Sequence, residues 1–167
     1  MTVSQLNEPI EWIKQGDWGS HLPLLHLALT KTTGAVVELG SGLISTPLLR
    51  NYCLENSRDF YSFDANKKWA EKTGSIWIED WHKTKDWMIP CGLVFVDESP
   101  GEHRKASIEV YGSIADAIVV HDTEVGAEYV YGMAHILSKY KHRVDYEVDS
   151  YPRTTLVSNK INVEKWI

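Results

Sequence analysis

The feature that most constrains this fold is the alternation of short apolar runs with amphipathic stretches along the chain. This is the order expected when parallel strands are connected through helices. Strands are predicted at 35–40, 60–65, 75–80, 91–99 and 116–124, and helices at 21–30, 46–56, 66–72, 103–115 and 126–140. The stretches 143–151 and 153–159 alternate like an antiparallel hairpin around Pro152. The sequence therefore predicts an α/β fold in one domain over 1–167, with a doubly wound, mostly parallel seven-stranded sheet and a C-terminal antiparallel hairpin.

The helix expected at 126–140 carries two further predictions. Tyr129, Met133, Ile136 and Leu137 have the spacing of one helix face, which we expect to be apolar and packed on the sheet. The basic segment 139–143 then falls at the C-terminus of this helix, where positive charge complements the helix dipole.

Composition narrows the classes of partner. With 17 Lys and Arg against 23 Asp and Glu, the chain has a net charge of −6, which argues against binding through phosphate neutralisation. We therefore expect no nucleic acid partner. The N-terminus resembles no signal peptide and no stretch approaches the ~20 apolar residues of a membrane span, so no membrane partner and a cytoplasmic location are expected. Cys53 and Cys91 lie in apolar surroundings and are predicted to be buried free thiols.

A glycine-containing turn follows the first predicted strand. Glu38 ends that strand, and Gly40 and Gly42 allow a tight turn into a helix whose N–H groups face a ligand. Asp64 follows the second strand, where a carboxylate can accept both ribose hydroxyls of an adenosine. Glu38 would oppose the pyrophosphate of a dinucleotide but would suit an amino group. The pattern thus favours an adenosine ligand that carries an amino group.

These residues resemble the first two motifs of the class I S-adenosylmethionine-dependent methyltransferases, which are Rossmann-like proteins with a seven-stranded sheet and a final reversed hairpin. Ile44 stands where the family has a third glycine, and the spacing from Glu38 to Asp64 is a little long. The resemblance implies S-adenosylmethionine as cofactor. It also implies an adenine contact after the third strand and a segment before the first strand that covers the methionine end. The cofactor-binding residues implied are Ser20, His21, Glu38, Gly40, Ser41, Gly42, Asp64, Ala65, Asp80 and Trp81.

A second group of polar residues follows the fourth and fifth strands. Asp97 and Glu98 end one strand and His121, Asp122 and Glu124 end the other, so they should converge if the strands are neighbours. Oxygen ligands of this kind suit Mg²⁺, whereas a single histidine suits a general base.

The arrangement is also similar to that of the catechol-type O-methyltransferases, which use a divalent metal. Asp97 and Asp122 match the metal ligands of those enzymes, but Thr123 replaces the expected Asn. Mg²⁺ held by Asp97 and Asp122 and solvated acids that cap the next helices are both open readings. The predicted catalytic residues are Asp97, His121 or His103 as the base, and Asp122.

Together these patterns predict a methyltransferase that acts on a small molecule. The chain lacks long insertions, so the acceptor is small or exposed, or another subunit of a homo-oligomer supplies a lid. Three alternatives remain open: a protein that binds or degrades S-adenosylmethionine without a methyl acceptor, a nicotinamide-dependent oxidoreductase on a similar fold, and a structural interaction module, which the clustered acids and glycines disfavour.

Overall fold

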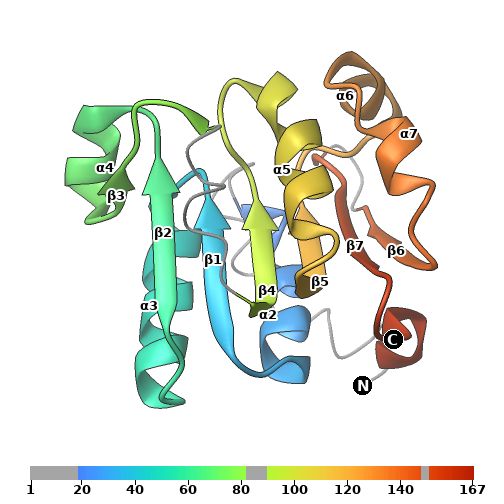
Figure 1. Cartoon of the computed structure of the whole chain (residues 1–167), viewed down its shortest axis with the longest axis horizontal. Helices are drawn as coiled ribbons and strands as arrows, with labels where there is room; N and C mark the ends of the chain where they lie inside the picture. The colour runs from blue at the N-terminus through green and yellow to red at the C-terminus, as the bar shows by residue number, and fades with distance from the viewer. Residues whose placement is uncertain (1–18, 82–89, 148–150) are drawn as a thin grey trace.

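The protein is built around one seven-stranded sheet (Figure 1). The computed structural model describes residues 19–81, 90–147 and 151–167. The sheet has the order β3-β2-β1-β4-β5-β7-β6. Its strands are β1 (Ala35–Leu39), β2 (Phe60–Asp64), β3 (Ile76–Trp77), β4 (Cys91–Val96), β5 (Ala115–Val120), β6 (His142–Tyr146) and β7 (Thr154–Ser158). The first five pair in parallel, and β7 pairs antiparallel with both β5 and β6. The predicted α/β class, seven strands and C-terminal antiparallel hairpin are confirmed.

Helices cover both faces of this sheet because its central strands are apolar on both sides. Val36 packs with Leu24 and Leu49 in one core cluster, while its neighbour Val37 packs with Ile108 and Leu137 in the other. All six residues of β4 are buried, as expected for a strand between two helical layers. The helices are α2 (Leu22–Lys31), α3 (Ser45–Glu55), α4 (Lys67–Thr73), α5 (Arg104–Tyr111), α6 (Val125–Val130) and α7 (Ala134–Leu137), with short 3-10 turns at Gly101–His103 and Val163–Trp166.

The strand order reverses between β1 and β4. The chain moves outward from β1 to β2 and β3 on one side, and from β4 to β5 on the other. At such a point the loops after the two central strands diverge and leave a crevice at the carboxyl end of the sheet. The loops that follow β1, β2, β4 and β5 therefore meet at one edge of the sheet.

The prediction of one continuous helix at 126–140 is wrong. The segment forms two short helices, α6 and α7, separated by a turn at Gly132, whose φ of +67° is incompatible with a right-handed helix. The break rotates α6 relative to the predicted face. Met133 and Leu137 are buried as expected, but Tyr129 is 82% exposed.

The basic segment 139–143 begins directly after Ser138, the C-cap of α7, but it runs on into β6. The preceding helix α7 ends at Leu137, and Arg143 is part of β6. Its guanidinium contacts Glu128 of α6 at 3.0 Å and Asp145 of the same strand at 3.0 Å. The positive charge of Arg143 is therefore balanced by these two ion pairs and not by a helix dipole.

The third predicted strand is shorter than expected. It was predicted at 75–80, but only Ile76–Trp77 pairs with β2, at an exposed sheet edge. The hairpin strands are also shorter than predicted, and residues 148–150 of the first lie outside the described residues. Strand lengths depend on partners that the local pattern does not reveal.

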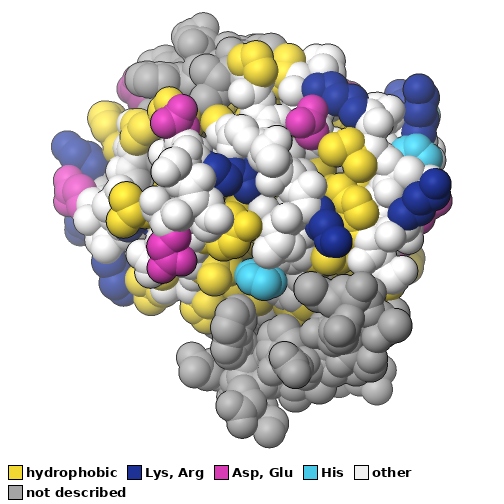
Figure 2. Space-filling model, turned by 90° about the horizontal axis from the view of Figure 1, so that it is seen from below, with side chains coloured by type: hydrophobic (Ala, Val, Ile, Leu, Met, Phe, Trp, Pro, Cys, Tyr) yellow, Lys and Arg dark blue, Asp and Glu magenta, His cyan; other side chains and the backbone are white. Residues whose placement is uncertain are grey.

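The surface away from the crevice carries mixed side chains. Seen from the amino ends of the parallel strands, basic and acidic side chains lie scattered among hydrophobic ones (Figure 2). Cys53 and Cys91 are buried and free, as predicted. Within the described ranges, no helix has the length and apolar character needed to cross a membrane.

Candidate functional site

The turn between β1 and α3 forms the floor of the crevice and depends on Gly40. This residue has φ +88°, and a Cβ placed on it would lie 2.4 Å from the carbonyl carbon and oxygen of Asp97. Only glycine allows the turn to pass this close to the end of β4. Two residues later, the Gly42 N–H donates to the Thr46 hydroxyl at 2.9 Å. The predicted glycine motif is thus a tight turn packed on the neighbouring strand.

Glu38 lies beneath this turn and is fully buried. Its Oε2 accepts hydrogen bonds from the hydroxyls of Thr46 at 2.8 Å and Ser62 at 2.6 Å, while its Oε1 has no partner. Burial outweighs these hydrogen bonds and raises the pKa of Glu38 to about 7. The carboxyl group is therefore placed to support the turn, and it does not line the crevice.

Asp64 ties the end of β2 to the same turn. Its Oδ2 accepts from the backbone N–H of Ser41 at 3.0 Å and from the Ser41 hydroxyl at 2.9 Å, and its Oδ1 accepts from the Asn66 N–H at 2.8 Å. The indole N–H of Trp69 donates to the Ser41 carbonyl at 2.6 Å. The Asp64 carboxylate and the turn between β1 and α3 are thus held together through Ser41.

The crevice encloses a cavity of about 850 Å³ at this edge of the sheet. That volume suits a cofactor-sized molecule. It is lined by nine of the predicted site residues, which are His21, Gly40, Ser41, Gly42, Asp64, Ala65, Asp97, His121 and Asp122. It is also lined by residues that were not predicted as site residues, which are Leu43, Ile44, Ser45, Asn66, Trp69, Ser99, Pro100 and Pro152. Asn66 directly follows the strand predicted at 60–65 and Ser99 ends the strand predicted at 91–99, so their position in the sequence was an available signal.

Five of the predicted site residues do not line the cavity: Ser20, Glu38, Asp80, Trp81 and His103. Asp80 is exposed. Trp81 is buried and donates its indole N–H to the Ser99 carbonyl at 3.3 Å. His103 ends the short 3-10 turn before α5. Asp80 and Trp81, which the resemblance assigns to an adenine contact, are therefore not among the described residues that line the cavity.

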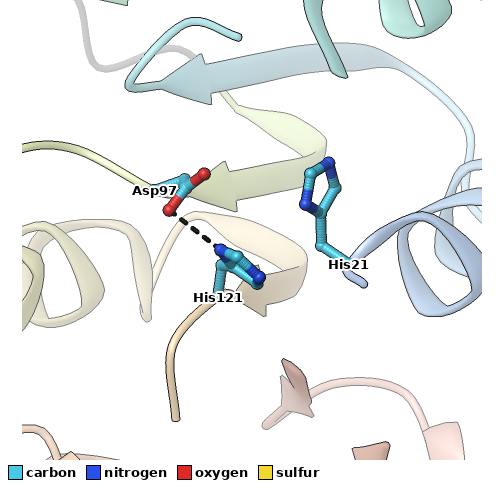
Figure 3. A group of neighbouring side chains, drawn as sticks. All are labelled: His21, Asp97 and His121. Atoms are coloured by element: carbon cyan, nitrogen blue, oxygen red, sulfur yellow. Dashed lines mark hydrogen bonds and ion pairs between the residues drawn. The ribbon is translucent and has the colours of Figure 1, made fainter. Parts of the chain in front are cut away.

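At the other end of the cavity, polar side chains from β4 and β5 converge as predicted. The two strands are parallel neighbours, so Asp97 and His121 follow them side by side. The His121 Nδ1 lies 3.2 Å from the Asp97 Oδ1 and 3.4 Å from the Asp122 Oδ1 (Figure 3 shows the first of these contacts). Glu98 points elsewhere, and its Oε1 accepts a hydrogen bond from the Ser107 hydroxyl of α5.

Arg104 is a buried partner of this group that sequence reasoning left without a defined role. Its guanidinium donates to the Asp97 Oδ1 at 3.0 Å and to the Asp122 Oδ2 at 2.8 Å. It also donates to the backbone carbonyls of Glu98 and His121. The guanidinium of Arg104 thus offsets one of the two negative charges and occupies an oxygen of each carboxylate, so the geometry does not support Mg²⁺ held between Asp97 and Asp122.

Neighbouring charges shift the pKa values of His121 and Asp97. Burial alone would lower the pKa of His121, but the charges of Asp97 and Asp122 and the hydrogen bond to Asp97 raise it. Burial would raise the pKa of Asp97, but His121 and Arg104 hold it below its ordinary value. Asp97 is therefore ionised, and His121 is a good acceptor for a proton.

Ser20 and His21 reach the same end of the cavity from the segment before α2. The Ser20 hydroxyl lies 2.8 Å from the His121 Nε2. The His21 ring packs 4.9 Å from the rings of both Phe95 and His121, and neither of its nitrogens has a hydrogen-bond partner. Burial and the nearby His121 lower the pKa of His21 to about 3. His21 is therefore uncharged at neutral pH.

Comparison with known proteins gives similarity in structure only. No protein-family model matches the sequence, and no curated protein matches it. The cofactor-bound protein Rv0187 from MTB is similar with a TM-score of 0.65 at 15% identity, over 87% of this chain and 82% of that one. A precorrin-6y C5,15-methyltransferase from Geobacter metallireducens has a TM-score of 0.54 at 12% identity, over 81% of this chain and 85% of that one.

The chain has the Rossmann-like fold of class I methyltransferases. A third structure with this fold corrects one expectation from the sequence. The Thermus thermophilus 16S rRNA N2 G1207 methyltransferase, in complex with AdoMet and guanosine, has a TM-score of 0.52 at 13% identity, over 83% of this chain and 39% of that one. Because a protein of this fold acts on rRNA, the expectation of no nucleic acid partner, drawn from net charge alone, is wrong as an exclusion. Net charge does not describe the local surface around a site.

Proposed function

We propose that this protein is an S-adenosylmethionine-dependent methyltransferase. The observation that carries the proposal is the single cavity with two different ends. A glycine turn and Asp64 form one end, and the Asp97–His121 pair forms the other. The first end suits a nucleoside with a charged amino acid tail, and the second suits removal of a proton from an acceptor.

The residues at the first end fit the cofactor. Gly40, Ser41 and Gly42 bring backbone close to the cavity without side chains in the way at the glycines. Asp64 lines the cavity, and its carboxylate, which already accepts from the Ser41 N–H, would also accept hydrogen bonds from the ribose hydroxyls. When bound, S-adenosylmethionine supplies an activated methyl group, so the protein has only to align it with a nucleophile.

The residues at the second end handle the acceptor. His121 has a raised pKa and is oriented by Asp97 on one ring nitrogen and Ser20 on the other. It would accept the proton that the acceptor loses as the methyl group is transferred, and Arg104 keeps Asp97 in place.

The lining of the cavity favours a small, neutral or cationic acceptor. Among the described residues that line it, Asp64, Asp97 and Asp122 are acidic and none is Lys or Arg. A carboxylate-rich pocket attracts amines and hydroxyl compounds more readily than anions.

The proposal is tested with S-adenosylmethionine labelled in its methyl group and a panel of small amines, phenols and alcohols. We expect one or more of these to become labelled as S-adenosylhomocysteine forms. His121→Gln should slow transfer at least about 100-fold through loss of the base. The control His26→Gln should not slow it, because His26 lies on α2 and does not line the cavity.

Other outcomes would contradict the proposal in distinct ways. Consumption of S-adenosylmethionine without any acceptor would identify a degrading enzyme, and binding of a nicotinamide dinucleotide alone would identify an oxidoreductase. Labelled RNA with no labelled small molecule would overturn the acceptor class but keep the methyltransferase.

A further inference from the structure

Three side chains from separate parts of the chain form a compact group beside the cavity. His21 precedes α2, Asp97 follows β4 and His121 follows β5 (Figure 3). One donor atom of each lies within 4.8 Å of a donor atom of the other two. Two imidazoles and one carboxylate are a donor set that binds divalent transition metals such as Zn²⁺ and Fe²⁺.

His21 gives an independent reason to expect a ligand. It is 4% exposed, and both of its ring nitrogens are buried without a hydrogen-bond partner. Buried polar atoms in folded proteins are nearly always satisfied, so an unpartnered pair calls for a bound water or ion. Its ring lies 4.9 Å from that of His121, and one of its nitrogens lies within 4.8 Å of a donor atom of both His121 and Asp97.

The distances within the group suit shared coordination. Two ligands each ~2.1 Å from a tetrahedral ion lie ~3.4 Å apart. The His121 Nδ1 and the Asp97 Oδ1 are 3.2 Å apart, close to that spacing. The His21 donor atom lies within 4.8 Å of the other two, so its ring would have to move toward them to complete the set.

The surroundings also suit a metal ligand. The second nitrogen of His121 faces the Ser20 hydroxyl at 2.8 Å, the kind of outer contact that fixes the tautomer of a metal-bound histidine. Arg104 offsets one negative charge of the Asp97 and Asp122 pair, so one remains to balance a divalent cation.

We propose that His21, Asp97 and His121 bind one divalent transition-metal ion at the acceptor end of the cavity. These are not the ligands expected from the catechol-type resemblance, since two of the three are histidines and Asp122 is not included. This inference deepens the proposed function. An ion held there would lower the pKa of a bound acceptor hydroxyl, whose proton would pass to solvent. His121 would then act as a ligand in the metal-loaded protein and as the base only without metal.

The test uses the full chain, freed of metal with a chelator, and measures binding of Zn²⁺ by calorimetry and of Co²⁺ by its visible absorption. We expect one ion per chain and the spectrum of a low-coordinate nitrogen and oxygen site. His21→Phe keeps the ring beside Phe95 but removes both nitrogens, and should weaken Zn²⁺ binding more than 100-fold. Ser20→Ala should weaken it about 10- to 100-fold, as loss of an outer contact does.

His26→Phe is the matched control, because His26 lies on α2 outside this group and should leave binding unchanged. Absence of saturable binding by the wild type, or equal binding by His21→Phe, would overturn the inference. Because no cofactor or acceptor is added, failure here leaves methyl transfer untouched. Failure of methyl transfer with intact zinc binding would likewise leave the metal site standing.

Discussion

At the scale of single residues, three of the buried side chains with unpaired polar atoms lie at or near the candidate site. Glu38 and Glu98 each bury one carboxyl oxygen without a partner, and His21 buries two nitrogens. Burial raises the pKa of each glutamate to about 7 and, with the help of His121, lowers that of His21 to about 3. The sequence predicted Glu38 and His21 as site residues, but their protonation depends on burial, which local sequence does not reveal.

Glu38 should make stability depend on pH. Its pKa is raised in the folded state, so the folded chain holds the proton more tightly than the unfolded chain does. The contribution is fully present below the ordinary pKa of 4.5 and is lost as pH rises through about 7, at a cost of ~3 kcal/mol. Chemical denaturation of wild type and Glu38→Gln from pH 5 to 8 should show that only the wild type loses this increment. A constant difference between the two across that range would contradict it.

His21→Phe should stabilise the metal-free protein. The substitution removes two buried, unpaired nitrogens while keeping a ring beside Phe95, and should add about 1 kcal/mol, or about 2–4 °C in Tm. The measurement is thermal unfolding in the presence of a chelator. A lower Tm than the wild type would show that the nitrogens have partners within the protein.

At the scale of elements, the turn between β1 and α3 determines the site. It rests on the end of β4, is supported from below by Glu38 and is held to β2 by the Asp64 contacts with Ser41. The cavity therefore depends on three strands meeting through one turn.

Gly40→Ala should disrupt this turn. Its Cβ would meet backbone atoms of Asp97 at 2.4 Å, and the positive φ adds strain, so we expect a loss of at least about 2 kcal/mol of stability together with cofactor binding. Gly126→Ala is the control, because no atom lies within 4 Å of its Cβ in helix α6 and the change should be neutral or slightly stabilising. Equal stability of the two variants by urea denaturation would refute the structural role given to the turn.

Elements were predictable where the pattern was local. The strand β4 and the helix α4 follow directly from the sequence. In α4 the Asn66 side chain accepts a hydrogen bond from the Trp69 N–H at the start, and Gly74 ends the helix in the left-handed region. The break between α6 and α7 did not, because Gly132 is compatible with a helix until tertiary packing selects a positive φ. Arg104 falls in the helix predicted at 103–115, but its contacts were not predicted, since they depend on two carboxylates that approach from β4 and β5.

At the scale of the whole molecule, the order of the strands brings the two ends of the site together. The reversal between β1 and β4 places the Asp64 loop and the His121 loop on opposite sides of one cavity. The sequence predicted this convergence from the rule that ligands bind at the carboxyl ends of strands where the order reverses. What it did not predict is the identity of apolar lining residues such as Leu43 and Pro152, which depends on the paths of the loops.

The central claim is that this cavity binds S-adenosylmethionine, and thermal unfolding with the ligand tests it most directly. At ~100 times the dissociation constant the cofactor should add roughly 2.7 kcal/mol, or about 5–10 °C in Tm. We predict this shift with S-adenosylmethionine and S-adenosylhomocysteine, its loss in Asp64→Ala, and its retention in the exposed control Asp59→Asn. No shift with either ligand, or a shift that survives in Asp64→Ala, would contradict the account.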